Sequence, residues 1–542
     1  MPGRPLAYRV RCPRMGAARP ALALVALMVA TGPSAIFAQE SGTYTFRMNL
    51  GGQTMGTEVV RRSPVRVEVD LVSRLGSGRV HYVLTVAPDG RVPAMWVAMY
   101  AAAGDTAPAQ SIDLRFEDDS VVATLSGRTS KTERLATEPG AMPYINPSAA
   151  MLEQLLRRAR DLGSSIGQVD TVPLFAVQGG STTPVMVTWT GADSATLAIA
   201  GVEMRACVSA GGDLESLAVP AQNLRFERVD GAHPMQPEKV DYGPPEGAPY
   251  TAEDVTVRTP AGLDLTGTLT VPDTAGGPVP AVVTITGSGA EDRDERIPLV
   301  RGYRPFWQIA DTLGRRGIAT LRLDDRGVNG SSPGPNSATS ADYADDIRAA
   351  VAWLRKRPGI DGRRIGLVGH SEGGLIAPMV AATDSSLAGI VLMAGPASTG
   401  RRILDYQNRG SIERAPGLSP AERDSVLATV PGRLAAMAEK SAWLRFFLDY
   451  DPLPTARRVR VPVLVLQGET DHQVTPEQAD TLAAAFREGG DADVTLKEFP
   501  DTDHLFLADP SGVPSAYATL PSHSVRPEVL GAIADWLAEH LK

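Results

Sequence analysis

The sequence predicts an α/β protein in two parts. A smaller β-rich domain comes first, and a mostly parallel sheet covered by helices, with a helical cap insertion, follows it. Two observations support this prediction. From residue 281 onward, short continuous apolar runs alternate with segments of helical period, which is typical of parallel strands buried on both faces. Between residues 43 and 229, apolar and polar residues alternate in short runs separated by turn signals, which favours antiparallel strands.

Residues 1–38 have the pattern of a signal peptide. Five arginines precede an apolar core at Ala21–Ala30, the pair Gly32-Pro33 ends it, and Ala38 offers a small residue for cleavage. We therefore expect export, to the periplasm or out of the cell. The alternative is an uncleaved anchor, but the apolar core is short for a membrane span, so we expect no stable membrane insertion after cleavage.

Residues 40–232 are predicted to form the β-rich domain, with strands such as Tyr44–Met48 and Arg79–Val86. One helix interrupts the strands, because Ser148 can cap a run in which the apolar residues between Met151 and Leu156 share a face. No motif states the role of this domain. A scaffold role is favoured over the binding of a partner or polymer.

Residues 233–249 hold five prolines and two glycines, which predicts a stiff linker and makes residues 250–542 the second domain. Its strands are expected at residues 255–258, 265–271, 281–286, 318–323, 365–369, 389–393, 461–466 and 492–497, with helices at 306–316, 341–356, after residue 371 and at 526–541. The net charge is −9 and no block of lysine and arginine stands out, so nucleic acid is a poor partner. The oligomeric state is not legible.

The second domain is organised around the string Gly369-His-Ser371-Glu-Gly373, between an apolar strand and a helical run. This is the sequence form of a nucleophile elbow, in which a strained strand-to-helix turn exposes a serine. The two glycines leave room where the chain doubles back. Ser371 is therefore the predicted nucleophile, and the backbone N–H of Glu372 is a predicted oxyanion donor. The alternative is a tight glycine turn without catalytic function.

An acid and a base follow at the ends of later strands, the edge where open α/β sheets place their sites. Asp471 comes after the apolar run at residues 463–466 and is the predicted acid, with Glu469 as the local alternative. His504 follows the last strand in a polar loop and is the predicted base, because it alone among the histidines fits the order Ser, Asp, His. His370 lies inside the elbow, where we expect its side chain to be unable to serve the neighbouring serine.

The second oxyanion donor is expected in the loop after the strand at 281–286. Glycines there let the backbone approach a substrate, and Ser288 is preferred, with Gly287 or Gly289 as alternatives. Between about residues 396 and 460 the strand–helix alternation stops, and helical segments predict a cap over the open end of the sheet. Its aromatic stretch Trp443–Tyr450 lines the substrate pocket or anchors the cap.

The C-terminal part resembles the α/β-hydrolase superfamily and, within it, a bacterial esterase group with G-S-G-x-x-D-R-D-E and G-H-S-E-G-G motifs, found here at Gly287–Glu295 and Gly369–Gly374. The resemblance covers about residues 250–542. It implies a serine carboxylesterase acting on small-molecule esters, with short acyl groups favoured, without a cofactor, and with Ser371, Asp471 and His504 as catalytic triad. Thr286-Gly287 stands where many members have His-Gly, which leaves the second oxyanion donor open.

Three other functions compete with this prediction: a serine peptidase of the prolyl oligopeptidase type, an acyltransferase, and a binding protein on a hydrolase scaffold. The first domain is too short and lacks the repeats of the propeller that precedes the catalytic domain in such peptidases. Arg293, between carboxylates, is expected to brace the oxyanion loop by ion pairs, with a contact to a substrate carboxylate as the alternative. A metal site at Asp292 and Asp294 is disfavoured, since no histidine accompanies them.

Overall fold

The computed structural model describes residues 41–542 apart from positions 51–52, 75–77, 101–104, 128–129, 163–164, 200, 210, 237–239, 274–276, 336, 416–417 and 491–492. The predicted signal peptide lies outside the described residues. The chain divides into two compact units, the first ending at Glu238 and the second running from Lys239 to Lys542. The predicted fold class is confirmed: a large β-rich part precedes an α/β part.

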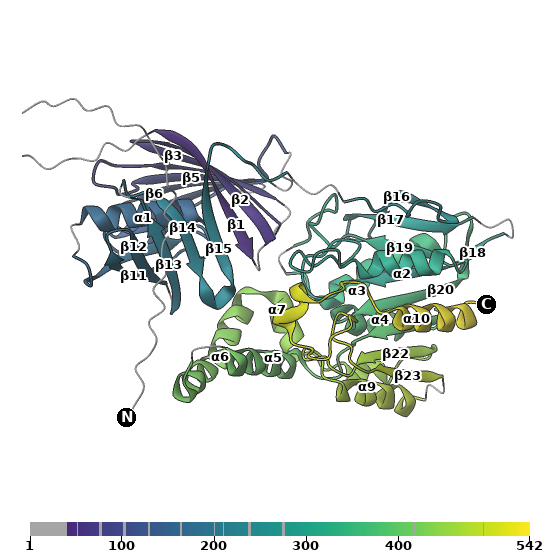
Figure 1. Cartoon of the computed structure of the whole chain (residues 1–542). Coiled ribbons are helices and arrows are strands. Elements are labelled where there is room, and N and C mark those ends of the chain that lie inside the picture. The colour runs from purple at the N-terminus through teal and green to yellow at the C-terminus, as the bar shows by residue number, and fades with distance from the viewer. Residues whose placement is uncertain are drawn as a thin grey trace, which may run out of the picture. The chain divides into compact units, whose positions relative to one another are not determined.

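The N-terminal unit contains one 15-stranded sheet, in which neighbours in sequence are mostly neighbours in space. All pairings are antiparallel except that of β9 with β10. The first and last strands, β1 and β15, pair along Tyr44–Leu50 and Leu224–Asp230, so the two ends of the unit meet in the middle of the sheet (Figure 1). The strands are β1 Gly42–Leu50, β2 Gln53–Ser63, β3 Arg66–Ser73, β4 Arg79–Thr85, β5 Ala94–Tyr100, β6 Gln110–Phe116, β7 Ser120–Ser126, β8 Lys131–Ala136, β9 Met142–Tyr144, β10 Val169–Ala176, β11 Ser181–Gly191, β12 Ser194–Ile199, β13 Val202–Val208, β14 Leu214–Val219 and β15 Leu224–Asp230.

Helix α1, Ala149–Asp161, is the predicted helix of this unit; a short 3-10 turn, η1, spans Pro220–Gln222. Ser148 caps α1, since its side chain accepts a hydrogen bond from the backbone N–H of Met151. The helix buries its apolar face and also Glu153 and Gln154. A buried carboxylate needs partners, and arginines from the sheet supply them: Arg62 and Arg228 each lie 2.9 Å from Glu153.

The C-terminal unit contains an eight-stranded sheet in the order β16-β17-β19-β18-β20-β21-β22-β23. The hairpin of β16 and β17 is antiparallel, β17 runs antiparallel to β19, and the remaining pairs are parallel. Strands and helices alternate as predicted (Figure 1). The elements are β16 Tyr250–Arg258, β17 Asp264–Pro272, β18 Val279–Ile285, α2 Pro305–Gly314, β19 Ala319–Leu323, α3 Ser340–Leu354, β20 Ile360–His370, α4 Glu372–Ala381, β21 Gly389–Met393, α5 Gly400–Arg414, α6 Pro420–Lys440, α7 Ala442–Asp449, α8 Leu453–Ala456, β22 Val463–Gly468, α9 Glu477–Glu488, β23 Val494–Phe499, η2 Pro514–Thr519 and α10 Pro527–His540.

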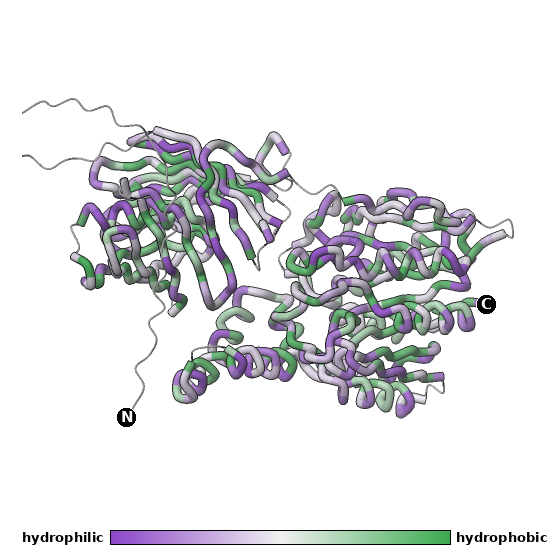
Figure 2. Tube along the Cα trace, viewed as in Figure 1, coloured by the Kyte–Doolittle hydropathy of each residue, from purple (hydrophilic) through white to green (hydrophobic). Residues whose placement is uncertain are grey.

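Apolar cores form on both faces of this sheet. On one face α3, α4 and α9 pack against side chains such as Val283 and Leu367; on the other, α2 and α10 pack against side chains such as Val282 and Val368. Consecutive strand residues thus point to opposite cores, which explains why β19, β21 and β22 are buried along their whole length and are mostly apolar (Figure 2). Ser371 and Asp471 therefore follow the buried ends of β20 and β22, whereas His504 follows the partly exposed edge strand β23.

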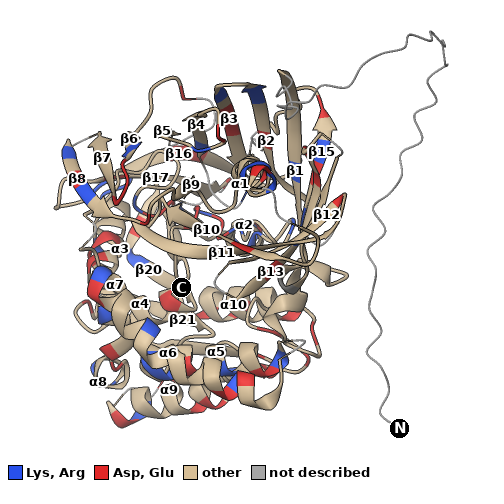
Figure 3. Cartoon of the chain, turned by 90° about the vertical axis from the view of Figure 1, so that its left-hand side faces the viewer, with Lys and Arg blue, Asp and Glu red and all other residues tan. Residues whose placement is uncertain are grey.

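Helices α5 to α8 lie between β21 and β22 in sequence and form the cap insertion. Helices α5 and α6 expose most of their residues and carry many charges (Figure 3). Helix α7 instead buries Leu444, Phe447 and Leu448.

The unit boundary lies within the predicted linker, and residues on each side bond to their own unit. The backbone N–H of Met235 donates to Thr57 in the first unit, while Arg322 donates to the carbonyl of Tyr242 in the second. No helix among the described residues has the length and apolarity that crossing a membrane requires.

Candidate active site

Ser371 occupies the turn between β20 and α4, with a φ of 53° that L-residues rarely adopt. A Cβ on Gly369 would collide with the carbonyl oxygen of Gly373, and one on Gly373 would collide with that of Ile285. Both positions therefore require glycine. The backbone N–H of Ser371 donates to the carbonyl of Met393, 2.9 Å away, which ties the turn to β21. This is the geometry expected of a nucleophile elbow.

Asp471 and His504 meet across the ends of β22 and β23. His504 Nδ1 lies 2.8 Å from Asp471 Oδ2, and both residues are buried. Asp471 Oδ1 accepts from the backbone N–H groups of Gln473 and Val474 at 2.7 and 3.0 Å. Because an ionised carboxylate only accepts, His504 carries its proton on Nδ1 and leaves Nε2 as a base. The alternative acid, Glu469, is exposed.

Ser371 and His504 line one cavity together with Ser288 and Glu372, so the structure brings the predicted site residues to one place. The remaining walls are largely apolar, and helices α5 and α7 of the cap supply part of them: Ile403, Leu404, Trp443 and Phe447. The rings of Trp443 and Phe447 stack with centroids 5.4 Å apart. Neither lysine nor arginine is among the described residues that line this cavity.

The loop after β18 carries the second predicted oxyanion donor. The N–H of Gly287 donates to Glu295 Oε1 at 2.9 Å, so it is not directed at a substrate. Gly289 is not among the lining residues, whereas Ser288 is. Of the three predicted residues, Ser288 is thus the one whose placement suits the role, together with the Glu372 amide at the start of α4.

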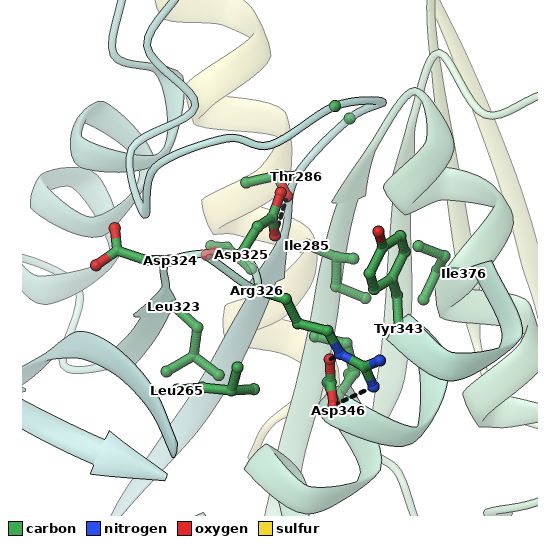
Figure 4. Close-up of a pocket in the computed structure, with 14 residues that line it drawn as sticks. Leu265, Ile285, Thr286, Leu323, Asp324, Asp325, Arg326, Tyr343, Asp346 and Ile376 are labelled. Atoms are coloured by element: carbon green, nitrogen blue, oxygen red, sulfur yellow. Dashed lines mark hydrogen bonds and ion pairs between the residues drawn. The ribbon is translucent and has the colours of Figure 1, made fainter. Parts of the chain in front are cut away.

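Asp325 holds two points of this loop, one of which, Thr286, is seen in Figure 4. Thr286 Oγ1 donates to one carboxylate oxygen and the backbone N–H of Glu291 to the other, each at 3.0 Å. Arg326 does not compensate this charge, because it turns towards Asp346. Burial raises the pKa of Asp325 to about 8, although these two hydrogen bonds act in the opposite direction.

Two further contacts at the site were not predicted. His370 places Nδ1 2.6 Å from Glu295 Oε1 and Nε2 2.8 Å from the backbone carbonyl oxygen of His504. Its side chain bonds to Glu295 and to the loop of the predicted base. Co-occurrence of the two motifs that contain Glu295 and His370 was the available signal.

The second unpredicted contact joins the cap to the elbow. Glu372 Oε1 accepts from Ser340 Oγ at 2.6 Å and from Trp443 Nε1 at 2.8 Å. Burial raises the pKa of Glu372, and these bonds, with one from the Ser288 side chain, oppose the rise. The aromatic stretch of the cap thus lines the pocket and anchors the cap at once.

Arg293 points away from this cavity. It lies 2.6 Å from Asp324 and 3.0 Å from Asp254, and its guanidinium packs over the ring of Tyr242. It therefore braces the loop through ion pairs. Asp292 and Asp294 pair with arginines, and the described residues contain no group of three or more side chains that could hold a metal ion.

Comparisons with known proteins match the C-terminal unit. Residues 282–515 fit the model of the alpha/beta hydrolase family. Esterase EstD of Thermotoga maritima is 27% identical over 307 residues, which is 56% of this chain and 70% of that protein. Dipeptidyl aminopeptidase BIII of Pseudoxanthomonas mexicana is 25% identical over 43% of this chain, but only 31% of its own length is covered. A solved Pyrococcus furiosus esterase matches with 17% identity and a TM-score of 0.39, over 56% of this chain and 97% of that one.

Proposed function

Since the C-terminal unit belongs to the α/β-hydrolase superfamily, we propose that this protein is an exported serine hydrolase that cleaves carboxylic esters through Ser371, His504 and Asp471. One observation carries the proposal: the 2.8 Å bond between His504 and Asp471 lies beside a cavity that the elbow serine also lines. The esterase relative supports the reaction class. Export rests on the leader sequence alone.

In this mechanism His504 Nε2 removes the hydroxyl proton of Ser371 as Oγ attacks the ester carbonyl. Asp471 keeps the imidazole in the required tautomer and stabilises the imidazolium that forms. The imidazolium then gives its proton to the leaving alcohol, and an acyl-enzyme remains. Water, activated by the same histidine, attacks the acyl-enzyme and releases the acid with Ser371 restored.

The negative charge that develops on the carbonyl oxygen is stabilised by the N–H groups of Glu372 and Ser288. Glu372 is the first residue of α4, where amide groups point along the helix towards the site. Loss of one such donor costs roughly 3 kcal/mol in the barrier. Gly287 contributes indirectly, because its N–H is held by Glu295.

The cavity favours neutral esters with small or apolar acyl groups. Its cap wall is apolar and aromatic, and three carboxyl groups, from Glu291, Glu295 and Glu372, face it without any lysine or arginine among the described lining residues. An anionic acyl group would lose its hydration there without a lysine or arginine to pair with. Esters with an acyl carboxylate are therefore expected to be slow substrates.

A chain-length series of p-nitrophenyl esters, from acetyl to dodecanoyl, tests the proposal on the mature wild type and Ser371→Ala. We expect fast turnover of the short esters and its loss in the variant, since removal of a triad nucleophile costs about 10⁶-fold in kcat. Full turnover in Ser371→Ala would refute the mechanism. An aminoacyl-proline anilide run alongside tests for a peptidase, and an added alcohol acceptor tests for acyl transfer.

A further inference from the structure

His370 lies between two loops that the reaction needs. One ring nitrogen faces Glu295, which also holds the N–H of Gly287 in the oxyanion loop. The other faces the backbone carbonyl of His504. Ser371 follows His370 directly in the chain, so a single imidazole touches the segments that carry the nucleophile, the base and the oxyanion donors.

The hydrogen bonds determine where the protons are. A carbonyl oxygen only accepts, so His370 Nε2 must carry a proton. Glu295 Oε1 already accepts from Gly287 and lies 2.6 Å from His370 Nδ1, which fits a carboxylate that accepts from both. His370 is then an imidazolium paired with the Glu295 carboxylate, and both side chains are only 3% exposed.

The surroundings agree with a charged pair. Burial would lower the pKa of His370, but the charge of Glu295 and its hydrogen bonds raise it. Other ionisable groups also act on the pair: Asp471 and His504 on the base side, and Glu291, Asp325 and Tyr303 on the side of Glu295.

Glu295 also holds a strained backbone. Its φ is 57°, in the left-handed region, and its N–H donates to the carbonyl of Asp292 at 2.8 Å. A glutamate without a special task has no reason to occupy this region, where a side chain costs of order 1 kcal/mol. Gly287 packs closely against this carboxylate, since a Cβ at position 287 would lie 2.9 Å from Glu295 Oε1.

We propose that Glu295 and His370 are a positioning pair, which fixes the oxyanion loop and the His504 loop relative to Ser371. The inference rests on the proposed function and adds residues that do not touch the reacting atoms. Its physical basis is that a displacement of about 1 Å of a catalytic group can reduce the rate by about 10²-fold.

Substitutions at position 370 can separate the two contacts. In His370→Gln, the amide nitrogen can reach the place of Nε2 and still donate to the His504 carbonyl, whereas His370→Asn keeps only a donor towards Glu295. His370→Ala removes the contacts to Glu295 and to the His504 carbonyl. Glu295→Ala removes only the partner of His370 Nδ1 and of the Gly287 N–H. His523→Gln is the matched control, because its ring also bonds to a backbone carbonyl, that of Arg301, away from the cavity.

The readouts are kcat and KM on a short p-nitrophenyl ester, the rate of fluorophosphonate labelling, and the pH profile of kcat/KM. We expect His370→Ala and Glu295→Ala to lower kcat about 10²-fold with little change in KM, and His370→Gln to recover part of the loss. The double alanine variant should be no worse than the poorer single variant, because the residues act as one unit.

The pH profile provides a readout that a purely structural role would not change. His370→Gln leaves the Glu295 carboxylate without its cation near His504, and a nearby negative charge favours the imidazolium of the base. The acid limb of kcat/KM should move to higher pH. Glu295→Gln combined with His370→Gln removes both charges and should return the limb to its wild-type position.

Three results would each overturn the proposal. They are a kcat of both single alanine variants within about threefold of wild type, losses in kcat that multiply in the double alanine variant, and an acid limb of His370→Gln at its wild-type position. Normalising rates to the folded fraction, measured by circular dichroism, removes simple unfolding from the comparison. If wild-type Ser371 resists fluorophosphonate, the proposed function itself fails. If the wild type reacts and the variants react equally well, only the positioning pair fails.

Discussion

Glu153 in the N-terminal unit and three carboxyl groups beside Ser371 in the C-terminal unit differ in how the protein compensates their charge. In the N-terminal unit, Glu153 is fully buried and accepts from Tyr44, Arg62 and Arg228 and from the backbone N–H of Leu214. Burial would raise its pKa, but the charges of the surrounding arginines lower it. Glu153 remains ionised and joins α1 to the sheet.

Beside Ser371 the carboxyl groups lack such cations. Among the described residues, no arginine pairs with Glu291, Asp325 or Glu372, and one buried oxygen of Glu291 has no hydrogen-bond partner. Burial raises the pKa of all three groups. Arginine pairing keeps Glu153 ionised, whereas the carboxyl groups beside the cavity have raised pKa values, a property expected of functional-site candidates.

The compensated cluster should show the largest effect on stability. Arg62→Ala leaves Glu153 buried with one cation fewer, and breaking a buried pair in this way costs about 3–5 kcal/mol. Urea unfolding of the full mature chain, followed by far-ultraviolet circular dichroism, measures it.

The neighbouring Arg61 is the matched control, since its side chain is 48% exposed and pairs with Asp70 at the surface. Arg61→Ala should cost no more than about 1 kcal/mol. Equal free energies of unfolding for the two variants would show that the bond of Arg62 to Glu153 contributes no more than a surface pair. The contrast between Glu153 and the carboxyl groups beside Ser371 would then have no energetic basis.

Sequence patterns predicted the α/β architecture because it is local: apolar strands, helical periods and glycine turns are readable in short windows. The 15-stranded sheet was only partly predictable. Alternation predicted antiparallel strands, but the pairing of β1 with β15 joins segments at opposite ends of the unit, and no local pattern encodes it.

The candidate site likewise has a part that local sequence patterns predicted and a part that depends on contacts between distant segments. Ser371, Asp471 and His504 follow from chain order and strand ends. The contacts of His370 were not predicted, because its partner Glu295 is 75 positions away in the chain. Pairing of β18 with β20 brings the segments together. Trp443 and Glu372 meet in the same non-local way, 71 positions apart.

Among the carboxyl groups beside Ser371, Asp325 should make the free energy of unfolding depend on pH. The pKa of Asp325 is raised from 3.8 to about 8 in the folded chain, so the unfolded chain releases this proton at much lower pH than the native one. The contribution is complete below pH 3.8 and is lost as the pH rises towards about 8. The loss at the upper end of this range should be several kcal/mol, since each unit of pKa difference corresponds to about 1.4 kcal/mol.

Asp325→Asn removes the titration, so its stability should decline less over this range. The measurement is the urea midpoint for loss of esterase activity, taken from pH 4.5 to 8.5 in wild type and variant. Asp345→Asn, which removes an exposed carboxylate on α3, should follow the wild type. Parallel curves for Asp325→Asn and wild type would mean that this carboxyl is compensated after all.

The smallest effect concerns the bond from the cap to Glu372. Trp443→Phe keeps an aromatic wall but removes the N–H that lies 2.8 Å from Glu372, leaving Ser340 as the other donor to that oxygen. One hydrogen bond of this kind contributes about 1 kcal/mol, or about fivefold in equilibrium. Because the bond holds the cap over the cavity both before and during the reaction, its loss should raise KM more than it lowers kcat.

Trp353→Phe on α3, which does not line this cavity, is the control. A loss in kcat alone would mean that the bond from Trp443 to the Glu372 carboxyl acts in the transition state and does not serve mainly to anchor the cap.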